Sequence, residues 1–398
     1  MIRKLAITLS LILGIFYISV AQLSEKLSKK VILSVNTNIE TYFFAEKLAV
    51  EHIGNYVFSN KDINYTHQPI VYYGLKQFMI WKESPVILRI SEILKQLRDT
   101  QYDNQPQLIF LLYRNQFPKT GYRWAIPEEF LSSAKQTYPG STKLFYELTD
   151  SLMSFYKQAN VQEFVDKNLF FYKGALAEAK KYINVKRIPY MEKWYGQKFD
   201  EYQIFLMPGM PISPGEDNFR AFGPTLKNGK RNIATMVFST SVELPFLSSL
   251  NDYKKFGFDN KDVVTLLTTH EFGHSFVNPY IENITSEIAT DTALFTTSLR
   301  KSLEDSYISS WKEYITEHIV RLGEIRIAKL MGDITEETRL REYHTKLGFI
   351  LIPLLERKIA EYETNRLQFP IFASYLPNLY QTIRKLTPSD IDTLVEKK

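Results

Sequence analysis

The sequence predicts an α+β protein in which a mainly helical N-terminal lobe precedes a core with a small mixed sheet and further helices. Three observations support this prediction. Apolar residues recur at helical spacing up to about residue 190, two strand-like segments around a loop rich in proline and glycine follow, and a capped helix comes directly after them. The expected segments are a signal peptide at 1–21, the helical lobe at 22–190 and the core at 191–398.

The first segment has the three-part layout of a secretory signal peptide. Arg3 and Lys4 precede an apolar run from Leu5 to Val20, and Ala21 is a small residue suited to cleavage. The run is shorter than the roughly 20 residues that span a bilayer, although an uncleaved anchor is the alternative. We therefore expect an exported protein, periplasmic or extracellular, that is not inserted in a membrane after cleavage.

Composition excludes several classes of function. The formal net charge is +5, and no block of like charges occurs, so a nucleic-acid partner is not expected. The chain contains no cysteine, which excludes a cysteine nucleophile and every metal site that uses thiolate. Any metal ion must be held by histidine, glutamate or aspartate.

The helical lobe is expected to begin with a strand and a capped helix. Val31 to Val35 has strand character, and Thr37 or Asn38 can cap a helix through Tyr42 to Ala49. Helical spacing of apolar residues then recurs in 86–97 and in 144–156.

The core segment is expected to begin with two strands. Tyr202 to Met207 is a strand stopped by Pro208, and Asn232 to Phe238 is the second. The next helix is capped by Asp259, carries apolar residues from Val263 to Leu267, and is expected to end at Asn278-Pro279.

That helix contains the run His270-Glu271-Phe272-Gly273-His274, which has the H-E-x-x-H pattern. The chain has only 6 histidines in 398 residues, so a chance match is rare. Two histidines four positions apart lie on one face of a helix, close enough to share a tetrahedral metal ion. A fortuitous match in a helical scaffold is the least favoured alternative.

A catalytic zinc ion needs a third protein ligand and an open position for water. We expect Glu317, on a helix from about 307 to 330, to be that ligand, with Arg321 one turn later orienting it. Glu317 can instead belong to an exposed acidic edge of the helix. The other candidates for the third ligand are His318, which can also be a core histidine, and Glu324, Glu282 and Glu287.

The H-E-x-x-H run followed by a helical glutamate resembles the gluzincin metallopeptidases, which have a zincin-like fold. The blocks HEFGHSFVNP (270–279), W-x-x-Y-x-x-E-x-x-V-R (311–321) and Y-E-x-N-R (362–366) are more closely similar to a bacterial family catalogued as domain of unknown function 4932. This resemblance spans about 30–385. The resemblance to gluzincins implies a zincin-like core at 191–398. The family of unknown function leaves the substrate open.

One zinc ion held by His270, His274 and Glu317 would lower the pKa of a bound water to near 7. Glu271 is then the expected general base. Resemblance to zincins also implies an oxyanion donor at Tyr343 or His344, although either can be a surface residue near a helix end, and Tyr314 is a second candidate. It further implies that a substrate adds beside an edge strand, for which 232–238 is the candidate.

The predicted function is an exported zinc-dependent metallopeptidase that acts on a peptide or protein. The alternative is a non-catalytic envelope protein that retains a zincin-like fold to bind a partner or peptide. A structural zinc site has four protein ligands, so a fourth ligand from Glu282 or His318 would favour this alternative.

Overall fold

The structure, a computed structural model, describes residues 23–57, 59–101, 103–215, 219–304, 306 and 308–397. The predicted signal peptide lies outside these residues. The described residues form two compact units: unit 1 contains those up to Ile183 together with Asp200–Thr265, and unit 2 contains Asn184–Phe199 and those from Leu266 onward. This division differs from the predicted boundary at residue 190, because the strands between residues 201 and 238 join the strand at 31–35 in one sheet through the strand at 201–206.

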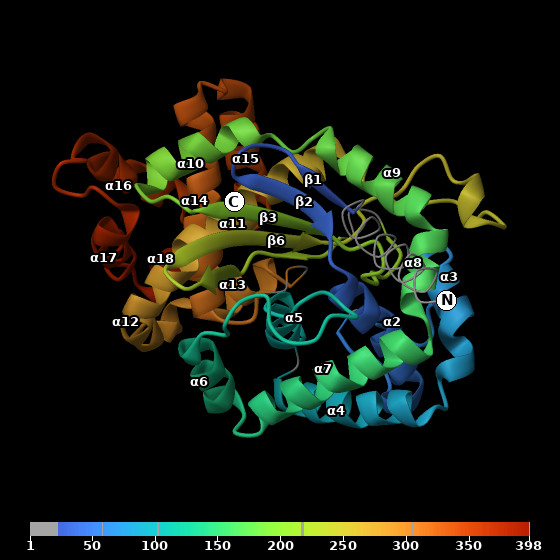
Figure 1. Ribbon diagram of the computed structural model, residues 1–398. Coiled ribbons are helices and arrows are strands. Elements are labelled where there is room, and N and C mark those ends of the chain that lie inside the picture. The colour runs from blue at the N-terminus through green and yellow to red at the C-terminus, as the bar shows by residue number, and fades with distance from the viewer. Residues whose placement is uncertain are drawn as a thin grey trace, which may run out of the picture. The chain divides into compact units, whose positions relative to one another are not determined.

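Unit 1 contains a six-stranded mixed sheet with the order β1-β2-β3-β6-β4, and β5 also pairs with β6 (Figure 1). Strands β2, β3 and β6 are parallel, whereas β1, β4 and β5 run antiparallel to their neighbours. The α+β class is therefore confirmed. The strands are β1 (Ser24–Lys26), β2 (Val31–Val35), β3 (Glu201–Leu206), β4 (Ala221–Phe222), β5 (Thr225–Asn228) and β6 (Arg231–Phe238).

Strand β6 lies inside the sheet. It pairs with β3 on one side and with β4 and β5 on the other, and its residues from Ile233 to Phe238 are all buried. The prediction that 232–238 is an edge strand open to a substrate is therefore wrong. The short strands at 221–228, which the sequence did not mark, occupy that side because the loop after β3 folds back on β6.

The helices of unit 1 surround a core rich in aromatic side chains. Phe44, Phe78, Phe155 and Phe164 contact one another with ring centroids 5.1 to 5.7 Å apart. Such rings supply large apolar areas to the core. The helices are α2 (Thr37–Ile53), α3 (Pro69–Phe78), α4 (Pro85–Gln101), α5 (Gln105–Leu112), α6 (Glu128–Thr137), α7 (Ser141–Gln158), α8 (Val161–Lys167) and α9 (Leu169–Lys180).

Helix α11 (Lys261–Ile281) carries the H-E-x-x-H run, but both of its ends differ from the prediction. The side chain of Asn260 accepts a hydrogen bond from the Val263 N–H, whereas Asp259 accepts one from Tyr182. The helix also continues past Asn278-Pro279 to Ile281. Proline removes one backbone donor, yet the helix continues for two residues to the buried Ile281.

Unit 2 is helical among its described residues. Its longest element, α14, begins at a capping box formed by Ser310 and Glu313 and ends at Gly332 in the left-handed conformation. The helices are α10 (Ile188–Tyr195), α12 (Thr285–Thr290), α13 (Thr297–Ser302), α14 (Trp311–Met331), α15 (Ile334–Lys346), α16 (Ile352–Thr364), α17 (Phe372–Ile383) and α18 (Pro388–Glu396).

Helix α14 contacts several other helices of unit 2, namely α10, α12, α15 and α16. Among the described residues, no helix has both the length and the apolar character that crossing a membrane requires.

Candidate metal centre

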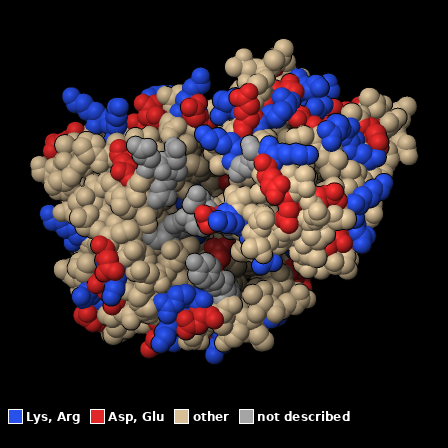
Figure 2. Space-filling view, turned by 180° about the vertical axis from the view of Figure 1, so that it is seen from behind, with Lys and Arg blue, Asp and Glu red and all other residues tan. Residues whose placement is uncertain are grey.

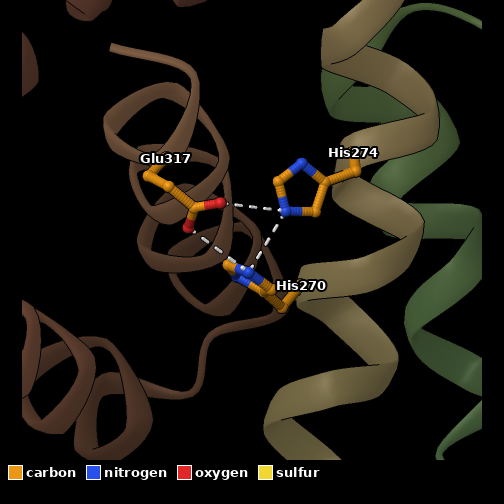
Figure 3. Close-up of side chains that lie close together, drawn as sticks. All are labelled: His270, His274 and Glu317. Carbon is orange, nitrogen blue, oxygen red and sulfur yellow. Dashed lines mark hydrogen bonds and ion pairs between the residues drawn. The ribbon is translucent and has the colours of Figure 1, made fainter. Parts of the chain in front are cut away.

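Three potential metal ligands meet in unit 2. Helix α11 supplies His270 and His274, and α14 supplies Glu317, so that their ligand atoms lie within 4.8 Å of one another (Figure 3). The two Nε2 atoms are 3.2 Å apart. Glu317 Oε2 lies 3.4 Å from His270 Nε2, and Glu317 Oε1 lies 3.2 Å from His274 Nε2. The structure thus brings together the three residues that the sequence singled out as ligands.

These distances fit a tetrahedral zinc ion. Zinc binds imidazole nitrogen and carboxylate oxygen at about 2.0–2.1 Å, so two ligands of a tetrahedral site are separated by about 3.3 Å. The two Nε2 atoms are 3.2 Å apart, and Oε1 and Oε2 of Glu317 each face one of them, at 3.2 Å from His274 and 3.4 Å from His270. The three side chains are 12 to 21% exposed, so the group is reachable from solvent.

The charge of the group also favours a cation. Burial lowers the pKa of His274, but the Glu317 carboxylate and its hydrogen bond raise it to about 9. Burial raises the pKa of Glu317, but the two imidazoles lower it by more, so that the pKa lies well below its usual range. Glu317 Oε2 is buried, and among the described residues no donor meets it with hydrogen-bond geometry. The carboxylate is thus an acceptor for a positive charge, carried by a proton or by a metal ion.

Each histidine is oriented through its second ring nitrogen. His270 Nδ1 lies 2.6 Å from Glu324 Oε1, and His274 Nδ1 lies 3.1 Å from Asn278 Oδ1. Because both acceptors are oxygen atoms, we assign the ring proton to Nδ1 in each case. The lone pair of each Nε2 then points into the group, which is the arrangement that metal-binding histidines adopt.

Arg321 lies beside Glu317, as the spacing on α14 predicted. Its Nη2 is 3.1 Å from Glu317 Oε2, at an angle that does not make a hydrogen bond. The guanidinium carbon lies 4.3 Å from the centre of the Phe349 ring, which limits its movement. Arg321 therefore holds a positive charge beside Glu317 Oε2, the oxygen that also faces His270.

Glu324 lies behind His270, where the sequence had offered it only as an alternative ligand. The carboxylate is fully buried and contacts His270 through Oε1 and His344 Nε2 through Oε2, at 2.6 and 2.7 Å. Burial raises the pKa of Glu324, but the two histidines outweigh this effect and lower it. The sequence signal was its position two turns after Glu317 on the same helix.

The structure places Tyr343 and His344, where an oxyanion donor was expected, on α15. His344 is fully buried, with Nε2 on Glu324 and Nδ1 3.4 Å from Arg321 Nη1. Both of its ring nitrogens therefore contact residues that lie behind the three grouped ligands, namely Glu324 and Arg321. Tyr343 is 40% exposed and contacts the ring of His344. Tyr314, the second candidate, is buried and donates to the Gly348 carbonyl.

Glu271 is 5% exposed and follows His270 on α11. Burial raises its pKa, and the neighbouring imidazoles of His270 and His274 act in the opposite direction. Its carboxylate lies about 100° around the helix from His270, and it is not among the three grouped ligands.

The other candidate ligands are engaged elsewhere. His318 is buried, with Nδ1 on the Tyr314 carbonyl and Nε2 accepting from the Leu351 N–H, which is the environment of a core histidine. Burial lowers its pKa to about 3. Glu282 pairs with Lys312. Glu287 pairs with Arg384.

A family model described as domain of unknown function (DUF4932) matches residues 141–382. The match includes α11, α14 and the Y-E-x-N-R block, and it begins later than the resemblance expected over 30–385. No curated protein and no solved structure is significantly similar to the chain.

Proposed function

Because the chain belongs to the DUF4932 family, whose description states no activity, we propose its function from the geometry of the metal centre. We infer that the protein is a zinc-dependent peptidase that hydrolyses peptide bonds. His270, His274 and Glu317 would hold one zinc ion, and Glu271 would act as the general base.

One observation carries this proposal. The two imidazole Nε2 atoms stand 3.2 Å apart, each faces a different oxygen of the Glu317 carboxylate at 3.2 to 3.4 Å, and both histidines are fixed by oxygen acceptors on their outer side. Side chains of this kind at this spacing suit zinc, whereas calcium and magnesium prefer oxygen ligands throughout. The H-E-x-x-H helix with a glutamate from a second helix supports a zincin-like, gluzincin-type centre.

The number of ligands supports a catalytic ion over a structural one. Among the described residues, the group contains three ligands, and the two candidates for a fourth, His318 and Glu282, are bonded elsewhere. Structural zinc sites have four protein ligands, whereas catalytic sites have three. This count argues against the alternative of a non-catalytic envelope protein with a structural ion.

A bound zinc ion supplies Lewis acidity, which lowers the pKa of a coordinated water to near 7 and polarises the carbonyl of a substrate. The chain's own residues do the rest. Glu271 takes the proton of the attacking water on its carboxylate and passes it to the nitrogen of the leaving amine. Glu324 keeps the His270 ring in the orientation that the site needs.

The proposed setting is outside the cytoplasm. The three-part layout of residues 1–21 supports export, and the substrate would then be a peptide or protein in the periplasm or the medium. No described residue argues for a nucleic-acid partner, since the charges of the chain are interspersed.

Substitution of the general base tests this proposal. We expect Glu271→Gln to bind zinc as the wild type does and to lose peptide hydrolysis by at least about 100-fold, because general-base catalysis contributes that much. Zinc content is measured by elemental analysis, and cleavage with a library of fluorogenic peptides. Glu342→Gln, an exposed acid on α15, is the matched control and should retain full activity.

Two outcomes would contradict the proposal. If the wild-type protein contains no zinc after purification in zinc-containing buffer, the proposed metal centre is wrong. Hydrolysis that survives Glu271→Gln would remove the proposed mechanism. Zinc bound with a fourth protein ligand, seen by X-ray absorption, would favour the non-catalytic alternative.

A further inference from the structure

A second feature of unit 2 is a cavity of about 440 Å³ that lies apart from the metal ligands. Its lining residues come from α10, α14 and the chain around the end of α16: Lys193, Trp194, Arg326, Lys329, Leu330, Glu363 and Arg366. Arg326 is nine positions after Glu317, or about 13 Å along α14. The volume falls within the range of about 300–1,000 Å³ that is typical of small-molecule sites. We call this cavity the basic pocket.

The single acid in the lining, Glu363, is already neutralised. Arg326 donates to both of its carboxylate oxygens, and the Trp194 Nε1–H donates to one of them at 2.9 Å. Arg326 itself is only 7% exposed and also contacts Glu356. Because these groups satisfy one another, Glu363 makes no hydrogen bond or ion pair with the other cations of the pocket, although the charge of Lys329 acts on it from a distance.

The other three cations have no carboxylate partner among the residues that the structure describes. The guanidinium of Arg366 donates to backbone carbonyls: its Nη1 donates to Trp194 O at 2.7 Å, and its Nη2 donates to Lys193 O and Pro370 O. Its guanidinium carbon lies 4.2 Å from the centre of the Tyr362 ring. The three hydrogen bonds to carbonyl oxygens fix the guanidinium in place and leave its positive charge without a carboxylate partner among the described residues.

The ammonium groups of Lys193 and Lys329 make no hydrogen bond or ion pair within the described part of the chain. Both lysines are exposed. Elsewhere, basic and acidic side chains are interspersed, as the face in Figure 2 shows. Three cations around one cavity without an ion-pair partner among the described residues therefore depart from the general pattern of the surface.

We propose that the basic pocket binds a small molecule that carries a phosphate group. A phosphate has a charge of about −1.5 to −2 near neutral pH and three acceptor oxygens. Two ammonium groups and a fixed guanidinium match this combination of charge and acceptors. Trp194 and Leu330 provide apolar atoms beside the cations, where the rest of the ligand would lie. The proposal also gives a role to the Y-E-x-N-R block, which supplies Glu363 and Arg366.

Binding of pyrophosphate and of inorganic phosphate to the purified full chain tests this inference. Isothermal titration calorimetry should show saturable binding of one ion per chain that weakens as salt is added. We expect Lys193→Gln and Lys329→Gln each to raise the Kd about tenfold, because each removes a charge-assisted hydrogen bond. Lys385→Gln, an exposed lysine outside the pocket, is the matched control and should leave the Kd unchanged.

Two further measurements distinguish binding in the basic pocket from binding at the metal centre and from general attraction of anions. His274→Ala should bind pyrophosphate as the wild type does, whereas loss of binding would mean that the metal centre holds the anion. Succinate, a dianion without phosphate oxygens, should bind at least about tenfold more weakly. The inference is overturned if no saturable binding occurs, if the lysine variants bind normally, or if succinate binds equally well. Circular dichroism and thermal unfolding should show both lysine variants to be folded, because the side chains are exposed.

Discussion

Glu324 connects the metal centre to the interior of unit 2. It is a buried carboxylate with one oxygen on His270 Nδ1 and the other on His344 Nε2. A carboxylate behind a ligating histidine fixes the tautomer and the ring orientation and makes the imidazole a stronger ligand. His344 in turn keeps Glu324 charged and in place. Both residues are therefore positioning residues in the proposed reaction, since neither faces the space between the three ligands.

Substitution of Glu324 should weaken zinc binding without removing a ligand. We expect Glu324→Gln to lower zinc affinity roughly 10–100-fold, as other changes to groups behind a ligating histidine do. Competition with a chromogenic chelator measures the affinity. Thermal unfolding of the zinc-free protein distinguishes this effect from a general loss of stability, and Glu342→Gln again serves as the control. Unchanged zinc affinity would show that His270 does not depend on Glu324.

Among the elements of unit 2, α10 connects the two ligand-bearing helices. The ring of Tyr195 stacks on Phe276 of α11 with centroids 4.5 Å apart. A Cβ atom built on Gly323 of α14 would lie 2.2 Å from the Tyr195 hydroxyl oxygen, and one on Gly273 of α11 would lie 3.5 Å from it. Gly323 thus leaves space for the tyrosine, whereas Gly273 leaves space for Val320 of α14, whose Cγ1 would lie 3.0 Å from a Cβ there. We expect the spacing of His270 and Glu317 to depend on this packing.

Filling this space should disturb the metal centre. We expect Gly323→Ala to destabilise the protein by about 1–3 kcal/mol, because the added methyl group overlaps the tyrosine hydroxyl. The zinc affinity of Gly323→Ala should fall together with its stability. Chemical denaturation and zinc titration measure the two effects.

A second variant provides the control for this effect. The Tyr195 hydroxyl is buried, and no described residue offers it a hydrogen-bond partner, so Tyr195→Phe alone should cost little or no stability. In the double variant the nearest ring atom is 3.1 Å from the new methyl group, and much of the lost stability should return. If Tyr195→Phe does not rescue Gly323→Ala, the clash is not the cause.

At the scale of the whole molecule, the proposed metal ligands and their outer contacts belong to one compact unit. His270, His274, Glu317, Glu324 and His344 all lie in unit 2, whereas the sheet lies in unit 1. A metal ion that joins two helices stabilises the part of the fold that contains them. Metal binding should therefore act on the local stability of unit 2.

Removal of the metal ion tests whether metal binding stabilises unit 2 locally. At a free zinc concentration of about 100 times the Kd, binding stabilises the folded state by about 2.7 kcal/mol, and a chelator should remove this stabilisation. Hydrogen exchange measured by mass spectrometry should show faster exchange in α14 and in the second half of α11 after chelation. The strands β2, β3 and β6 should exchange at the same rate with and without chelator. A change centred on the sheet would contradict this expectation.

Local sequence patterns predicted many elements of the fold. Strand 31–35 was predicted at its observed position, and strands β3 and β6 and helix α14 were predicted within a few residues of theirs. The pairing of β6 on both sides could not be predicted in this way. It depends on the fold of the loop after β3, and burial alone does not distinguish an inner strand from a covered edge.

The sequence by itself determined that His270 and His274 face the same way, because residues four apart in a helix lie one turn apart whatever surrounds them. It also determined that any metal ligand must be histidine or a carboxylate, since cysteine is absent. Only the tertiary structure decided that Glu317 joins these histidines while Glu324 lies behind one of them and His318 lies in the core. The three residues lie on one helix within eight positions, and the packing of α14 against its neighbours determines which side chain meets α11.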